Sequence, residues 1–228
     1  MSAHFRDANE GAEAIPARLH VVRHRHRRPY AAVVLAGNYE EAGDTGRWRV
    51  FPGDVLIHDS FEAHQDRIGA GGCALINLDM VSDLPVRGAF RIEDPDSVAR
   101  LAERDREDAL ACLMDQKHVP VPPLDDWPDQ LARDLGDEGF ESLGAWAETM
   151  GLAAESVSRG FRRCYGVAPV RFRLELRARR ALALIRAGGQ GLAAIAQECG
   201  FADQPHLTRT LAALTGRTPR RWREAGVN

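Results

Sequence analysis

Two histidines separated by a single residue, His24 and His26, are the first residues of this sequence with an evident chemistry. Successive side chains of a β-strand point to opposite faces, so both imidazoles would lie on the same side of a strand. Imidazole nitrogen is a common ligand of zinc, nickel, copper and iron(II). The pair therefore predicts part of a transition-metal site. The alternative is a solvated strand edge, because both histidines lie within the charged stretch 23–28.

Residues 195–223 have the pattern of a helix, a tight turn and a second helix. Gly200 tolerates the left-handed conformation that such a turn needs. Leu207, Leu211 and Leu214 repeat at the spacing of the buried stripe of an amphipathic helix. Four polar residues are expected to point outward near the start of this helix, where a recognition helix reads bases: Gln204, His206, Thr208 and Arg209.

The same layout occurs earlier, in residues 142–166, with a glycine at the turn. Val157 and Phe161 form the expected buried stripe, whereas Ser158 and Arg159 are expected to point outward. A basic helix is predicted between the two segments, from residue 169 to about residue 187. Arg159 and Arg209 occupy matching places, so the sequence contains a weak internal repeat of one motif.

These two segments and their spacing resemble the AraC/XylS family of bacterial transcription regulators. The patterns are A-x(3)-G-x(5)-V-S-R-x-F-x(4)-G-x-x-P, R-x(3)-A, I-A-x(3)-G-F-x-D-Q-x-x-L-T-R and G-x-T-P-x-x-W-R, over about the last hundred residues. The resemblance implies two helix-turn-helix units, joined by the long helix, that enter successive major-groove segments of duplex DNA. Carried onto this sequence, the base-reading residues are Glu155, Ser158, Arg159, Gln204, His206 and Arg209.

Other arginines are expected to contact phosphates, which give affinity and register rather than sequence discrimination. They are Arg162, Arg163, Arg171, Arg173 and Arg217. The sequence departs from the family at Ala153, where a capping serine is usual, and this weakens the start of the first recognition helix by about 1 kcal/mol. Ala212 and Ala213 stand where basic residues are common, and Pro205 removes a backbone donor.

The charges are divided between the two parts of the chain. Residues 140–228 carry 14 arginines and 7 acidic residues, a net charge of +7, whereas the remainder carries 16 basic and 26 acidic residues. The net charge of −3 for all 228 residues hides this division. A basic segment fused to an acidic one is expected when only the first contacts a polyanion such as double-stranded DNA. Solvated arginine-rich helix faces are the alternative.

The amino-terminal half contains short apolar or alternating runs separated by turn signals. Strands are predicted at 19–23, 31–35, 47–51, 55–57, 74–78 and 89–92, with turns at 37–38, 43–44, 52–54 and 69–72. This spacing indicates an antiparallel β-barrel or sandwich. The predicted fold class is therefore α+β with two domains, of which the second is all-α.

The strand region also resembles the cupin barrel, whose two motifs are H-x-H-x(3)-ligand-x(6)-G and G-D-x(9)-H. The matching residues are His24, His26, Tyr30, Gly37, Gly53, Asp54 and His64. The resemblance implies that His24, His26 and His64 face one cavity and hold zinc, nickel, copper or iron with an open coordination position. Tyr30 replaces the usual glutamate, and His58 is expected to be structural. A barrel without metal, as is common in sensor domains of these regulators, is the alternative.

The expected domain boundaries follow from these patterns. They are a flexible arm at 1–17, a cupin-like sensor domain at 18–93, an amphipathic helix at 94–117, a proline-rich linker at 118–124 and the DNA-binding domain at 125–228. The helix at 94–117 is predicted to pack on the barrel or against a second subunit. The DNA-binding domain is expected to begin with a helix from Trp127 to about Leu135.

The leading hypothesis is a sequence-specific DNA-binding transcription regulator, not an enzyme, that responds to a small-molecule or metal effector. Double-stranded DNA, a second copy of the chain and RNA polymerase are the expected partners. The alternatives are a cupin metalloenzyme with a helical appendage, a metal-sensing regulator, and an architectural DNA binder without a ligand. The cysteines form no C-x-x-C pair, and neither a signal pattern nor a membrane-length apolar run is present, so a cytoplasmic location is expected.

Overall fold

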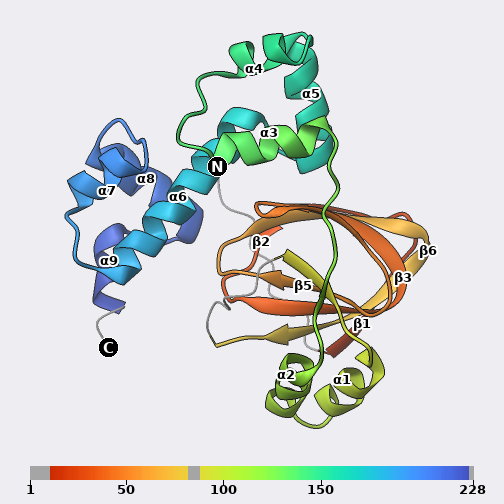
Figure 1. The fold of residues 1–228 in the computed structure, drawn as a ribbon. Coiled ribbons are helices and arrows are strands. Elements are labelled where there is room, and N and C mark those ends of the chain that lie inside the picture. Colours follow the sequence, from red (N-terminus) through yellow and green to blue (C-terminus); the bar gives the residue numbers. More distant parts are fainter. Residues whose placement is uncertain (1–10, 82–87, 226–228) are drawn as a thin grey trace. The chain divides into compact units, whose positions relative to one another are not determined.

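The computed structural model describes residues 11–81 and 88–225, which divide into two compact units. The amino-terminal unit is a β-sheet domain with two helices, and the carboxyl-terminal unit is helical (Figure 1). This organisation confirms the predicted two-domain α+β class.

The described residues of the amino-terminal domain contain eight strands in one antiparallel sheet. They are β1 (Gly11–Ile15), β2 (His20–Arg25), β3 (Tyr30–Gly43), β4 (Gly46–Val50), β5 (Asp54–His58), β6 (Ala63–Asp79), β7 (Gly88–Arg91) and β8 (Val119–Pro120). The strand order is β1-β6-β3-β5-β7-β8, while β2 pairs with β6 and β4 pairs with β3. The long strands β3 and β6 therefore connect most of the sheet, and Figure 1 shows that both curve strongly.

Two of the predicted turns are wrong, because β3 runs through Gly37 and β6 runs through residues 69–72. The two strands bend together at this point. Gly37 and Gly72 have φ values of 71° and 78°, and a Cβ atom on Gly37 would lie 2.0 Å from the carbonyl oxygen of Gly72. The pairing register of β3 with β6 also shifts twice here. The glycines thus permit a bulged bend in a continuous ribbon, not a hairpin.

One face of the sheet is covered by α1 (Pro95–Ala102) and α2 (Arg106–Asp115), which lie side by side in Figure 1. Val98, Ala109 and Leu113 are fully buried against apolar residues of β3, β5, β6 and β7. The prediction of a single helix at 94–117 is wrong, because the segment forms two helices. The carboxylate of Asp105 caps the N-terminus of the second helix by accepting hydrogen bonds from two backbone amides of α2. Packing on the domain's own sheet is the role that the structure shows for these helices.

The other face of the sheet lines the interior of the domain. Its buried residues include Tyr30, Val34, Tyr39, Trp48 and Leu75. Large aromatic and aliphatic side chains on this face enclose the pocket described below.

The predicted arm and linker both contribute to the sheet. Part of the predicted arm at 1–17 is a strand, because Gly11–Ile15 pair with β6; residues 1–10 lie outside the described residues. The linker supplies β8, which pairs with β7, and the backbone N–H of Leu124 donates to the carbonyl oxygen of Arg47 at 2.7 Å. Proline is compatible with this position because an edge strand does not need every amide donor.

The carboxyl-terminal domain is built from helices at the predicted places. They are α3 (Trp127–Gly136), α4 (Leu143–Thr149), α5 (Ala154–Tyr165), α6 (Pro169–Ala187), α7 (Leu192–Glu198), α8 (Gln204–Thr215) and α9 (Pro219–Ala225). The long α6 packs against α7, α8 and α9. It also brings Phe172 edge-on to Phe161 of α5, with ring centroids 5.2 Å apart. One central helix therefore connects the two helix pairs (Figure 1).

Candidate nucleic-acid interface and histidine pocket

The pair α7 and α8 is fixed by local contacts at its turn. Gly200 has φ 70°, and the carboxylate of Asp203 caps α8 by accepting a hydrogen bond from the backbone N–H of His206 at 2.6 Å. The guanidinium of Arg177 donates to the carbonyl oxygen of Gly200 at 3.1 Å. Leu207, Leu211 and Leu214 are buried as predicted. The opposite face of α8 is therefore held in a defined orientation toward solvent.

The residues predicted to read bases from α8 differ in exposure. Gln204 and Arg209 are exposed, whereas His206 and Thr208 are half-buried. The imidazole of His206 lies edge-on to the ring of Phe201, with centroids 5.3 Å apart. Gln204 and Arg209 are consequently the side chains of this set with the freest access to a ligand.

The pair α4 and α5 repeats this arrangement. Gly151 has φ 65° at the turn, and Val157 and Phe161 of α5 are fully buried. Ser158 is half-buried, and its neighbour Arg159 is exposed. The remaining predicted residues of α5 are also exposed: Glu155, Arg162 and Arg163. The side chains at the equivalent positions of α5 and α8, Arg159 and Arg209, therefore both face solvent.

Three of the arginines assigned to phosphates have intramolecular partners. Arg171 pairs with Glu175 at 2.8 Å, and Arg173 donates to the carbonyl oxygen of Phe140 at 2.9 Å. The guanidinium of Arg217 lies 5.2 Å from the ring centroid of Trp222. These arginines make contacts within the helical domain that helical periodicity alone does not indicate.

The interior of the sheet holds a pocket of about 160 Å³ in which four strands place titratable side chains opposite one another. His24 of β2 is paired with His64 of β6 across the sheet. Tyr30 of β3 is paired with His58 of β5, and their rings are stacked with centroids 4.4 Å apart. The sheet therefore concentrates imidazoles from three strands in one buried place.

The histidines predicted to bind metal are brought together. His24 Nε2 lies 3.0 Å from His26 Nε2, and His64 Nε2 lies 3.1 Å from the Tyr30 hydroxyl. All three imidazoles are buried, and one nitrogen from each lies within 4.8 Å of the others. Tyr30, which stands at the usual ligand position of the cupin frame, contacts His64 directly.

Two carboxylates that sequence reasoning missed lie on the same side of the sheet. Glu41 of β3 is paired with Asp66 of β6. Glu41 Oε2 lies 3.4 Å from His58 Nε2 and 3.2 Å from His64 Nδ1, and Asp66 Oδ1 lies 3.2 Å from His64 Nδ1. His58, expected to be structural, is thus part of the same group of side chains.

Burial and these carboxylates shift the pKa values of the histidines in different directions, so their protonation states differ. Burial opposes a charge on His64, but Asp66 and Glu41 outweigh it and raise its pKa well above the usual value. Burial lowers the pKa of His58 to about 4 and, with the neighbouring histidines, the pKa of His26 to about 2. The pocket therefore holds a charged imidazole between carboxylates, next to neutral imidazoles.

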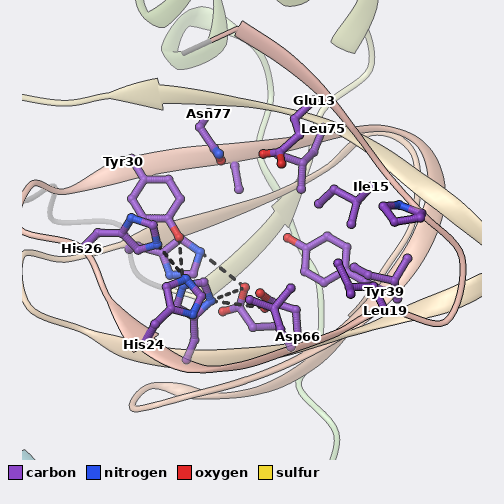
Figure 2. Close-up of a pocket in the computed structure, with 17 residues that line it drawn as sticks. Glu13, Ile15, Leu19, His24, His26, Tyr30, Tyr39, Asp66, Leu75 and Asn77 are labelled. Carbon is purple, nitrogen blue, oxygen red and sulfur yellow. Dashed lines mark hydrogen bonds and ion pairs between the residues drawn. The ribbon is translucent and has the colours of Figure 1, made fainter. Parts of the chain in front are cut away.

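The two ends of the pocket differ in polarity. Figure 2 shows His24, His26 and Tyr30 at one end, and Ile15 and Leu19 toward the other. Its described lining includes carboxylates and imidazoles but neither lysine nor arginine. This lining favours a cationic ligand over an anionic one.

Residues 146–225 match the family described as "Helix-turn-helix domain", whereas no curated protein matches the chain. The chain is similar to a number of solved structures, three of which illustrate the range. An AraC-type regulator from Chromobacterium violaceum has 27% sequence identity and a TM-score of 0.38, and the match covers 42% of this chain and 85% of that chain. The DNA-binding domain of AdpA in complex with a target DNA has 20% identity and a TM-score of 0.39, with 44% of this chain and 93% of that chain covered. Fatty-acid-bound ToxT from Vibrio cholerae has 11% identity and a TM-score of 0.40, with 95% of this chain and 96% of that chain covered.

Residues 146–225 form a helix-turn-helix domain of the matched family, and the chain is a DNA-binding transcription regulator. This confirms the assignment made from the sequence patterns. Within residues 11–81 and 88–225, no helix combines the length and the apolar character needed to cross a membrane.

Proposed function

We propose that this regulator reads DNA with two recognition helices, α5 and α8, one from each helix-turn-helix unit. The main support is the exposure of Arg159 and Arg209 at equivalent positions of two similarly built helix pairs. A guanidinium can donate two hydrogen bonds to guanine in the major groove. Glu155 and Ser158 of α5, together with Gln204, His206 and Thr208 of α8, are the accompanying contacts to base edges.

The experiment is selection of bound sequences from random duplex DNA, followed by affinity measurements on the selected site. Arg209→Ala should weaken binding to that site by about 1 to 3 kcal/mol and relax the preference at one base pair. Arg162→Ala is the control, because a phosphate contact affects all sequences alike. An equal loss on selected and random DNA for Arg209→Ala would remove Arg209 from the base-reading set.

The cupin-like pocket is proposed to bind the effector, and a divalent transition metal is the ligand that its donors fit best. Four imidazoles and two carboxylates converge there, and buried charges of this kind are stable when they coordinate a metal. The cupin resemblance assigns the ion to His24, His26 and His64, and a second group of donors in the same pocket is formed by Glu41, His58 and His64. When bound, the metal would supply a fixed positive charge that holds the strands carrying its ligands in one geometry.

Regulation is tested by measuring affinity for the selected DNA with Zn²⁺ and with a chelator. A change of at least about fivefold would support a metal-responsive regulator. Equal affinity in both conditions, with metal bound, would contradict the proposed regulation.

A second copy of the chain and RNA polymerase are proposed as further partners, because the AraC-type domain marks the chain as a transcription regulator. Sedimentation of the protein with and without DNA, and co-purification with polymerase on promoter DNA, test these two partners. A monomer in both sedimentation conditions would exclude the dimer.

A further inference from the structure

The pocket contains a second set of metal-binding donors that the H-x-H frame does not include. Glu41, His58 and His64 contribute one carboxylate oxygen and two imidazole nitrogens that lie within 4.8 Å of one another. We infer that a divalent transition-metal ion in this pocket is bound by Glu41, His58 and His64, with Asp66 beside them, rather than by the His24 and His26 pair. This inference rests on the proposal that the pocket binds a metal.

The spacing of the donor atoms in the second set is compatible with a shared ion. Ligand atoms that bind a tetrahedral zinc ion at about 2.0 to 2.1 Å are separated from one another by about 3.3 Å. Glu41 Oε2 lies 3.4 Å from His58 Nε2 and 3.2 Å from His64 Nδ1. These two separations match that value, and the His58 and His64 donor atoms lie within 4.8 Å of each other.

The two donor sets also differ in whether their nitrogen atoms already have hydrogen-bond partners. The Nε2 atoms of His24 and His26 are 3.0 Å apart and form a hydrogen bond with each other. By contrast, His58 is only 2% exposed, and neither of its ring nitrogens has a hydrogen-bond partner among the described residues. His64 Nδ1 lies 3.2 Å from Glu41 Oε2 and 3.2 Å from Asp66 Oδ1, so an ion bound there would replace the proton that these carboxylates favour on His64. Buried polar atoms of this kind need a partner, which a metal ion would provide.

Charge gives a third reason. The side chains of Glu41 and Asp66 are 3% and 13% exposed, so both carboxylates are shielded from water. Two carboxylates neutralise a divalent ion, whereas His24 and His26 bring no negative charge to it. The ion is therefore more stable near β3 and β6 than near β2.

The orientation of His58 is fixed before an ion binds. Its ring is stacked on Tyr30 with an interplanar angle of 16°. Two histidines and one carboxylate are a recurring ligand set for zinc and for iron(II), with open positions left for water. The set selects these metals over magnesium and calcium, which prefer oxygen ligands.

The test uses the full chain and two matched substitutions. His58→Gln removes a ligand that belongs only to the second set, and His26→Gln removes one that belongs only to the H-x-H pair. With Zn²⁺ as the titrant in calorimetry, His58→Gln should weaken binding about tenfold or more, and His26→Gln should leave it within about threefold. The opposite ranking would overturn the inference, as would a wild-type protein that binds no Zn²⁺.

A second measurement does not depend on how the variants fold. X-ray absorption of the zinc-loaded wild-type protein should indicate two imidazoles and at least one carboxylate for each ion. Three imidazoles without a carboxylate would contradict the inference. Because neither measurement involves DNA, zinc bound by Glu41 and His58 with unchanged DNA affinity would support this inference while refuting the proposed regulation.

Discussion

Substitution of Gly37 by alanine should destabilise the sheet at the bend between β3 and β6. Gly37 has φ 71°, and an added Cβ atom would lie 2.0 Å from the carbonyl oxygen of Gly72. The left-handed conformation costs a residue with a Cβ atom about 1 to 2 kcal/mol. Relieving the contact requires the opposing backbone to move by about 1 Å, an overpacking effect of about 1 to 3 kcal/mol. The expected loss is about 3 kcal/mol.

Hydrogen exchange of the full chain, followed by mass spectrometry of peptides from β3 and β6, measures this loss. A loss of 3 kcal/mol increases the population of the open sheet by more than about 100-fold, because each 1.4 kcal/mol is a factor of ten. Gly71→Ala is the matched control, since a Cβ atom there meets nothing within 4 Å. Equal exchange in the two variants would refute the packing argument for this bend.

Three further predictions concern protonation, helix capping and thiol reactivity. With chelator present, the free energy of unfolding should fall as the pH drops from 6.5 toward 4. Burial lowers the pKa of His58 to about 4, so in this pH range the unfolded chain binds a proton that the folded chain does not. His58→Gln should reduce that slope, which denaturant titrations at several pH values measure, while His26, whose pKa is lowered to about 2, still contributes to it. The raised pKa of His64 adds stability that is lost only as pH rises. Asp203→Ala should lower the unfolding free energy of the helical domain by about 1 kcal/mol, since it removes the cap at His206 N, and a calorimetric scan would detect it. Burial raises the pKa of Cys73 to about 11, so at pH 8 only about one thiol in a thousand is ionised and alkylation by iodoacetamide should be slow.

Each of these predictions has a contradicting outcome. An unchanged pH slope in His58→Gln would show that this imidazole does not govern the acid response. Unchanged stability in Asp203→Ala would mean that water replaces the cap without loss. Alkylation of Cys73 at the rate of an exposed thiol would show that this part of the sheet opens readily.

The helical domain was predictable because its signals are local. Gly151 and Gly200 mark the turns, and Pro169 marks the start of α6, where the structure has it. Each signal acts within a few residues, so it does not depend on distant contacts. The exposure of Arg159 and Arg209 follows from the same helical periodicity.

The histidine pocket was predicted only in part, because strand alternation fails at a bulge. Tyr30 and Val34 point inward at even positions, but Glu41 points inward at an odd one. A shift of one residue moves the following side chains to the other face, and the register shifts near Gly37 do this in β3. The sequence carries the glycine but not the direction of the shift, so Glu41 could not be assigned to the pocket.

Strand β8 has a mechanical consequence for the segment that leads out of the sheet domain. It is hydrogen-bonded to β7, which is hydrogen-bonded to β5, the strand that ends at His58. The backbone of the segment that leads to α3 is therefore joined by two successive hydrogen-bonded ladders to the strand that carries His58.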